Sequence, residues 1–307
     1  MMFGHLRVKS PWSQLGIFLG LFGAGFIILA IISALMVLAS GIPQASITSL
    51  DWSQPRILNL MKWLQALSSI VLFLLPALFF ALITFRGRTF YFLGLRPVAN
   101  KNMYLLAVII IMMAMPFVIW LGQVNESIPL PKWMTGLESD AQKQMEAFLK
   151  ADNTTQVIIN VLLIALLPAV SEEICFRGAL QRILINISKS PWVGIVFTAI
   201  LFSALHLQFQ GFIPRMFLGI ILGALYWYSG SLWTSILAHF IYNGVQVVVV
   251  SYAPEYVSKN PQMNILLALV SGIAIAGLFW AYKSWSTATY AKEYETHELN
   301  GNNEFIA

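Results

Sequence analysis

Two adjacent glutamates and two histidines are the residues of this chain whose types and positions could do chemistry. Glu172 and Glu173 are the only carboxylates between residues 155 and 252, and His206 and His239 lie in the same stretch. Ionisable side chains in so apolar a segment are costly and by default mark function. A carboxylate in a dry pocket can take a proton from water near neutral pH, and an imidazole can share that work. These residue types therefore indicate hydrolysis by an activated water.

The glutamate pair has a basic partner at helical spacing. Glu173 and Arg177 are four residues apart and can pair on one face of a helix. Glu172 is turned by about 100° from Glu173, because about 3.6 residues make one turn. Glu172 is thus left without an obvious partner on its own helix. We expect Glu173 and Arg177 to support the site, with a purely structural ion pair as the alternative.

The two histidines also have neighbours at helical spacing. Phe202 and His206 are four residues apart, so the aromatic ring can pack against the imidazole. His239 and Asn243 have the same spacing and place two polar groups in one space. An imidazole N–H and an amide N–H₂ are suitable donors for a developing oxyanion. The alternative for this second pair is an interhelical hydrogen bond.

The chain positions favour convergence of these residues. The connection near Ser188 lies 16 residues after Glu172 and 18 before His206. In an antiparallel hairpin the two side chains then differ in height by roughly 3 Å, at about 1.5 Å per residue. Counting from the connection near Gly230 brings His239 to mid-membrane height. We therefore expect one shared chamber, provided that the helices are neighbours.

The elements that position these residues are predicted to be membrane helices. The chain has 307 residues, of which 58% are hydrophobic and 10% charged, against about 45–50% and about 25% in soluble domains. This composition excludes a soluble enzyme, and the scattered basic residues behind the net charge of +5 do not indicate nucleic-acid binding. Apolar runs of about 20 residues predict a polytopic all-α bundle. We predict eight spans, at 15–39, 63–85, 103–122, 155–185, 190–209, 212–229, 232–252 and 263–283.

Lysines and arginines in the short loops predict the orientation. The N-terminus carries Arg7 and Lys9, and the second connection has four basic residues and no acid, whereas the third connection (123–153) is rich in acids. The N-terminus and second connection are thus expected inside and the third connection outside. Eight spans return the C-terminus inside, and the composition of the tail 286–307 is typical of disorder.

Three further features concern packing. The outer segment 137–151 has the periodicity of an amphipathic helix, which could cover the core or lie solvated. Gly16-x-x-x-Gly20 and Gly219-x-x-x-Gly223 permit close helix contacts. Arg215, near an outer helix end, is expected to snorkel to the membrane interface.

Three motifs together resemble the CPBP family of membrane-embedded proteins. This family includes the type II CAAX prenyl endoproteases, bacteriocin-processing and bacteriocin-immunity proteins, and proteins similar to lysostaphin resistance protein A. Its pattern is E-E-x-x-x-R, then F-x-x-x-H, then H-x-x-x-N or D. The chain has all three in order, at residues 172–177, 202–206 and 239–243.

The resemblance implies an endopeptidase that acts in or at the membrane. Glu172 and His206 would activate water, His239 and Asn243 would form the oxyanion hole, and Glu173 and Arg177 would support the site. No cofactor is required by this reading. Zinc held by Glu172, His206 and His239 is the open alternative, and the residues do not decide it.

We divide the chain into residues 1–154, 155–250 and 251–307. The first part holds three spans and the outer amphipathic loop, the second the catalytic core, and the third the last span and the polar tail. The expected location is the cytoplasmic membrane of a bacterium, as a multi-pass protein with both termini cytoplasmic. The expected partners are the lipid bilayer and a membrane-associated protein or peptide substrate, and not nucleic acid.

Three competing functions remain open from the residues. The buried glutamates and histidines would also suit a proton-coupled transporter, although no inverted repeat is visible. A non-catalytic membrane protein of the bacteriocin-immunity kind could retain the site without using it. Cys175 with His206 would suit a thiol protease, but Cys175 lies in an apolar helical run.

Overall fold

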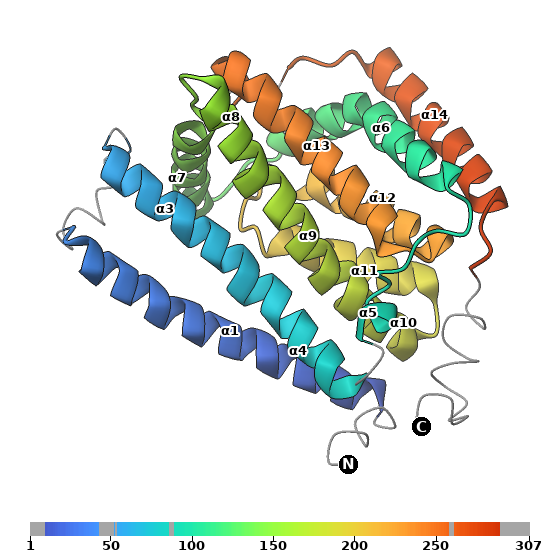
Figure 1. Ribbon diagram of the computed structural model, residues 1–307. Coiled ribbons are helices and arrows are strands. Elements are labelled where there is room, and N and C mark those ends of the chain that lie inside the picture. Colours follow the sequence, from blue (N-terminus) through green and yellow to red (C-terminus); the bar gives the residue numbers. More distant parts are fainter. Residues whose placement is uncertain (1–9, 43–51, 53, 86–88, 258–260, 289–307) are drawn as a thin grey trace.

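The computed structural model describes residues 10–42, 52, 54–85, 89–257 and 261–288. Every regular element within these residues is a helix, which confirms the predicted all-α bundle (Figure 1). Seven helical stretches are long and apolar enough to cross a membrane. They are α1 (Pro11–Ser40), α3 to α4 (Pro55–Thr84), α6 (Asn102–Glu126), α8 to α10 (Thr154–Ser188), α12 (Phe212–Ser229), α13 (Leu232–Tyr252) and α14 (Ile265–Ser284).

Two of these stretches are built from consecutive helical segments. The first comprises α3 (Pro55–Ser68), the π-helical η2 (Ser69–Leu74) and α4 (Leu75–Thr84). The second comprises α8 (Thr154–Asn160), η3 (Val161–Leu166), α9 (Leu167–Glu173), η4 (Ile174–Gln181) and α10 (Arg182–Ser188), of which η3 and η4 are π-helical. The remaining elements are α5 (Thr89–Phe92), α7 (Lys132–Leu149), α11 (Pro191–Ala204) and the 3₁₀ helix η5 (Pro254–Val257).

Seven of the eight predicted spans match these helices, and the eighth, α11, has 14 residues and is shorter than a membrane span. Helix α11 ends at Ala204, whereas the hydropathy pattern continued to residue 209. The chain leaves the helix there because Leu207 adopts a left-handed backbone with φ 54°. The amphipathic helix predicted at 137–151 is confirmed as α7, and Phe148 and Leu149 at its end are buried. The predicted disorder of 286–307 falls almost entirely outside the described residues.

The long helices lie side by side in an order that differs from the order along the chain (Figure 1). Helix α1 contacts α4, segment η2 contacts α9, α9 contacts α13, α13 contacts α6, and α6 contacts α14. Helices α11 and α12 pack on each other, and α11 also packs on η4 and α10. The segment α9–η4 is therefore surrounded by helices from both halves of the chain.

Prolines account for two of the three π-helical segments. Pro76 and Pro168 lack an N–H donor. The segments η2 and η3, of six residues each, end just before these two prolines. Local π geometry is one way in which a membrane helix accommodates a proline. Segment η4 has no such proline. An isolated π segment is often found at a functional site, and η4 begins directly after Glu173.

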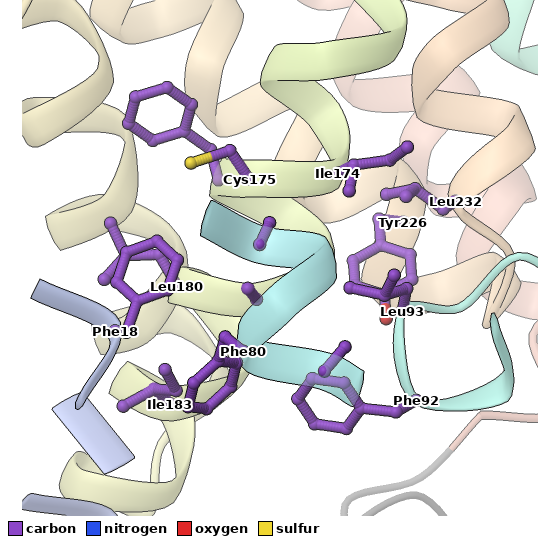
Figure 2. Close-up of a cluster of buried hydrophobic side chains, with 14 of the residues drawn as sticks. Phe18, Phe80, Phe92, Leu93, Ile174, Cys175, Leu180, Ile183, Tyr226 and Leu232 are labelled. Carbon is purple, nitrogen blue, oxygen red and sulfur yellow. The ribbon is translucent and has the colours of Figure 1, made fainter. Parts of the chain in front are cut away.

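A hydrophobic cluster holds η4 against the first half of the chain. Figure 2 shows Cys175 and Leu180 of η4 in the same cluster as Phe18 of α1 and Phe80 of α4. Gly25, and not Gly16 or Gly20, makes the close approach of α1. A Cβ at Gly25 would lie 2.8 Å from the Val71 carbonyl, whereas Gly16 and Gly20 have no such neighbour within 4 Å among the described residues. The predicted close contact at Gly16 and Gly20 is wrong.

Candidate active site

Glu173 is the most tightly bound residue of the site. Its side chain is fully buried, and Arg177 Nη1 donates to its Oε1 over 2.6 Å, which confirms the predicted pair. His239 Nδ1 donates to the same Oε1 over 2.8 Å, and Ser235 Oγ donates to Oε2. Three donors thus compensate the cost of burying this carboxylate.

Arg177 is held by elements far apart in the chain. Its Nη2 donates to the Gly219 carbonyl of α12 over 3.2 Å, and its guanidinium carbon lies 4.5 Å from the centre of the Phe202 ring. One turn further along η4, Gln181 Nε2 donates to the Gly223 carbonyl over 3.2 Å. A hydrogen-bonded charge over an aromatic ring is a geometry that arginine suits well.

The glycines of α12 make this hydrogen-bond ladder feasible. A Cβ at Gly219 would lie 2.9 Å from the Ala199 Cβ, and a Cβ at Gly223 would lie 2.6 Å from the Gln181 Oε1. The close helix contact predicted for this glycine pair is confirmed. Its consequence goes beyond packing, because the Gly219 carbonyl accepts from Arg177, which braces Glu173, and the Gly223 carbonyl accepts from Gln181.

His239 lies between the two glutamates. Its Nδ1 donates to Glu173, while its Nε2 lies 4.0 Å from the Glu172 Oε2. Glu172 and His239 are both nearly inaccessible to solvent. Glu172, which has no partner on its own helix, therefore faces an imidazole from α13. The gap between the two atoms is longer than a direct hydrogen bond.

His206 lies just after α11 and is half-buried. Its Nδ1 is 2.8 Å from the Phe202 carbonyl, and because a carbonyl only accepts, this nitrogen carries the proton. In the neutral ring, Nε2 is then the acceptor. Among the described residues no hydrogen bond or ion pair joins His206 directly to Glu172.

Phe202 connects the parts of the site. Its ring centre lies 5.0 Å from that of His206 and 6.0 Å from that of His239, in edge-to-face geometry. Its ring also packs at 5.1 Å on Phe176 of η4. Phe176 and Phe202 are each one turn closer to the connection at Ser188 than Glu172 and His206. This contact confirms the antiparallel register expected from the chain positions.

Asn243 lies one helical turn beyond His239 on α13 and is half-buried. Its side chain makes no hydrogen bond to any other described residue. Asn243, His239 and Ser235 follow at intervals of four on one helix face. That spacing could have identified Ser235, which the sequence analysis missed.

The proposed zinc ligands do not form a metal site in this geometry. Glu172, His206 and His239 were the candidate set, and no three His, Cys, Asp or Glu side chains among the described residues are arranged to hold a metal ion. We therefore derive the chemistry from the protein side chains.

Cys175 is not part of the site. Its sulfur lies in the hydrophobic cluster of α1, α4 and η4, with 1% of the residue exposed (Figure 2). A thiol in apolar surroundings is poorly activated. The geometry therefore does not support the thiol-protease reading.

The loop that carries His206 is fastened by residues outside the three motifs. Asn125 of α6 donates to the Phe209 carbonyl and accepts from the Ile213 N–H, both over 2.8 Å. Glu138 of α7 accepts from the Gln210 N–H over 2.9 Å. Both residues precede the predicted catalytic core, and no spacing in the sequence connects them to His206.

Arg215 belongs to the same surroundings. It does not simply snorkel to the interface, since its Nη2 donates to the Gln208 Oε1 over 2.6 Å and its Nη1 to the Gln208 carbonyl over 3.4 Å. Its charge is close enough to those of Glu172 and Glu138 to interact with them electrostatically. The site thus contains a second arginine that the motif analysis did not include.

Comparison with known proteins supports the resemblance. Residues 154–245 match the type II CAAX prenyl endopeptidase Rce1-like family. Uncharacterized protein YpbD of Bacillus subtilis (strain 168) is 30% identical over 92 residues, which are 29% of this chain and 44% of that protein. The chain thus matches less than half of the length of this relative. No solved structure matches the chain significantly.

The matched region contains all three motifs, and the helices around it are those of a multi-pass membrane protein. Over residues 154–245 the chain is therefore similar to the type II CAAX prenyl endopeptidase Rce1-like family.

Proposed function

We propose that the protein is an intramembrane endopeptidase that cleaves a membrane-associated protein or peptide with a water activated by Glu172 and His206. The observation that carries this proposal is the cluster in which Glu172, His239 and the Phe202–His206 pair come together from three helices. The family match adds the reaction class.

In the proposed mechanism His206 Nε2 accepts a hydrogen bond from the water, because Nδ1 is committed to the Phe202 carbonyl. Glu172 takes a proton from this water as the water oxygen attacks the scissile carbonyl carbon. The proton then passes from Glu172 to the leaving amine nitrogen. The peptide C–N bond breaks and leaves a carboxylic acid and an amine, so that water is the only co-reactant.

The developing oxyanion requires hydrogen-bond donors. We assign this role to the Asn243 amide and to His239 Nε2. Because His239 Nδ1–H donates to Glu173, Nε2 can donate only when the ring carries both protons. Glu173 then serves as the counter-ion of the His239 imidazolium, while Arg177 and Ser235 hold Glu173 in place.

We further propose that residues 155–250 form the catalytic core and that the first three spans brace it. Phe73 of η2 packs on Phe176 at 5.7 Å, and Lys62 of α3 donates to the buried Asn160 over 2.8 Å. Hydrolysis near the membrane centre needs a water-accessible space that excludes lipid, which these helices would enclose. The proposed location is the bacterial cytoplasmic membrane with both termini inside.

The test is cleavage by purified protein in detergent, with a farnesylated C-a-a-X peptide as the first substrate. We expect Glu172→Gln to lower kcat by about 10²–10⁴-fold, as is usual for loss of a general base. Glu146→Gln, at an exposed position of α7, is the matched control and should cleave like the wild type. Cleavage that survives both Glu172→Gln and His206→Ala would refute the mechanism.

Physiological substrates can be sought in membranes of cells that carry wild type or Glu172→Ala. An endopeptidase predicts an uncut protein that accumulates in the variant. Proton flux into liposomes without cleavage would instead favour the transporter. A biological effect that persists in Glu172→Ala would favour the non-catalytic reading.

A further inference from the structure

The two ends of the helix bundle carry opposite charges. Helix α7 lies at the end away from α5 and α10 (Figure 1). Among the described residues, every carboxylate outside the site lies at this acidic end, namely Glu126, Glu138, Asp140, Glu146, Asp152 and Glu255. The opposite, basic end has Arg96, Lys101, Lys189 and Lys283. Because basic residues mark the cytoplasmic side of a membrane protein, the acidic end is expected outside.

The candidate active site lies closer to the acidic end. Helix α12 begins there, since Asn125, next to Glu126, accepts from the Ile213 N–H. Arg177, which braces Glu173, donates to Gly219, seven residues after the first residue of α12 and ten before its last. Arg215 in the first turn of α12 is close enough to Glu172 for their charges to interact.

Packed side chains close the path from the site to the basic end. All eight residues of η4 are buried, and so are eight of the nine residues 218–226 of α12 that face them. Gln181 donates to the Gly223 carbonyl, and Arg182 Nη1 lies 3.3 Å from the Tyr226 hydroxyl oxygen. On α13, Ser235 is also fully buried. Water and substrate therefore have no evident route through these residues.

The site is open in the other direction. His206 and Asn243 are half-buried, and Gln246, further along α13 toward the acidic end, is exposed. A cavity of about 300 Å³ lies where α11 ends and α12 begins, and Ala204 and Leu207 in its wall are exposed. His206 belongs to the same loop as this wall. A polypeptide segment can therefore approach the site from the acidic end.

We propose that the active site opens away from the cytoplasm, through the cavity between α11 and α12, and that its substrates are segments exposed on the outer side of the membrane. The proposal rests on the proposed endopeptidase function and on the orientation proposed with it, and deepens both by naming the substrate class. Membrane-anchored proteins whose cleavable segment has been exported belong to that class. Segments that stay in the cytoplasm do not.

The first experiment measures accessibility and does not depend on turnover. Single new cysteines are treated with a membrane-impermeant sulfonated maleimide on spheroplasts, and wild type, whose only cysteine is buried, is the blank. We expect Ala204→Cys in the cavity wall to be labelled like Lys143→Cys at the acidic end. Lys101→Cys at the basic end should react only after lysis. Leu207→Cys, in the same wall, replaces Ala204→Cys if that variant fails to fold.

The second experiment measures the side of cleavage. A farnesylated C-a-a-X peptide coupled to a charged, impermeant dye is added to spheroplasts and to inside-out vesicles of the same cells. We expect cleavage by spheroplasts and almost none by inside-out vesicles, with equal specific activity of the two preparations after detergent is added. Glu172→Gln in both preparations is the blank for other proteases.

Each other result has a definite meaning. Labelling of Lys143→Cys on spheroplasts without Ala204→Cys or Leu207→Cys would overturn the outward opening. Labelling of Lys101→Cys in place of Lys143→Cys would also overturn it, because the same cavity would then face the cytoplasm. Cleavage by inside-out vesicles alone would do the same. Outward labelling of Ala204→Cys without any cleavage in detergent would count only against the endopeptidase function.

Discussion

Glu172 and Glu173 are adjacent in the chain and have different surroundings. Glu173 receives hydrogen bonds from Arg177, Ser235 and His239, whereas the ion-pair partner of Glu172 among the described residues is the His239 Nε2 at 4.0 Å. A carboxylate that accepts three hydrogen bonds is a poor base, and one with fewer hydrogen bonds is a better one. The different hydrogen-bonding of the two residues is therefore the basis for assigning the base to Glu172 and the support to Glu173.

The buried pair of Glu173 and Arg177 supports a test by mutation. Arg177→Met leaves an unneutralised carboxylate with no solvent exposure, and we expect a loss of about 3–5 kcal/mol in the free energy of unfolding. The double variant Arg177→Met with Glu173→Gln should lose less free energy of unfolding than the two single variants together, because the uncompensated charge is gone. Unfolding measured in detergent checks this, and strict additivity would contradict it.

At the scale of elements, α12 supplies acceptors because its glycines bring its backbone close to η4. Gly219→Ala places a methyl group 2.9 Å from the Ala199 Cβ. We expect it to cost about 1–3 kcal/mol, as overpacking does, and to lower cleavage because the carbonyl that holds Arg177 moves.

Gly277→Ala on α14 is the matched control, because a Cβ there has no neighbour within 4 Å. It should leave cleavage unchanged. Equal activity of the Gly219 variant and this control would show that the close approach of α12 does not matter for the site.

The loop between α11 and α12 carries His206 and depends on α6 and α7. Asn125 is 3% exposed and holds the later part of this loop and the start of α12. Asn125→Asp keeps the acceptor for the Ile213 N–H but loses the donor to the Phe209 carbonyl. We expect kcat to fall by about tenfold, the effect of losing one buried hydrogen bond.

In the Asn125→Asp measurement, KM should change less than kcat, since Asn125 holds the backbone of the loop that carries His206 and is not assigned to substrate binding. Asn102→Asp, at an exposed position of the same helix, is the control. A change confined to KM would argue against positioning of His206.

At the scale of the whole molecule, the basic second connection and the acidic third connection predict opposite sides of the membrane. Cys175 is the only cysteine and is buried, so new cysteines can be labelled selectively. An impermeant maleimide applied to intact cells should label Lys143→Cys of α7 and not Lys101→Cys. The reverse pattern would invert the proposed orientation.

The helix Thr154–Ser188 also bears on the whole molecule. Its 35 residues are roughly 50 Å long at about 1.5 Å per residue, well beyond the bilayer core of about 30 Å. This length allows the helix to extend past the bilayer core.

The sequence alone determined the elements and the local pairs of this protein. Hydropathy over about 20 residues marks a membrane helix because the bilayer offers the backbone no hydrogen-bond partners. Four-residue spacing predicted the contacts of Glu173 with Arg177 and of Phe202 with His206, because the two residues of each pair lie within one helical stretch or at its end. The contact between the Phe176 and Phe202 rings also agrees with the antiparallel register expected from counting residues from the connection at Ser188.

Only the tertiary structure decided which groups meet across helices. Nothing in the spacing connects His239 to Glu173, Ser235 to Glu173, or Asn125 to the loop of His206, because these contacts depend on how helices distant in the chain pack together. The early end of α11 and the place of Arg215 beside Gln208 were hidden for the same reason. Hydropathy reports the preference of a residue for lipid or water, but it does not indicate which residue a buried charge will contact.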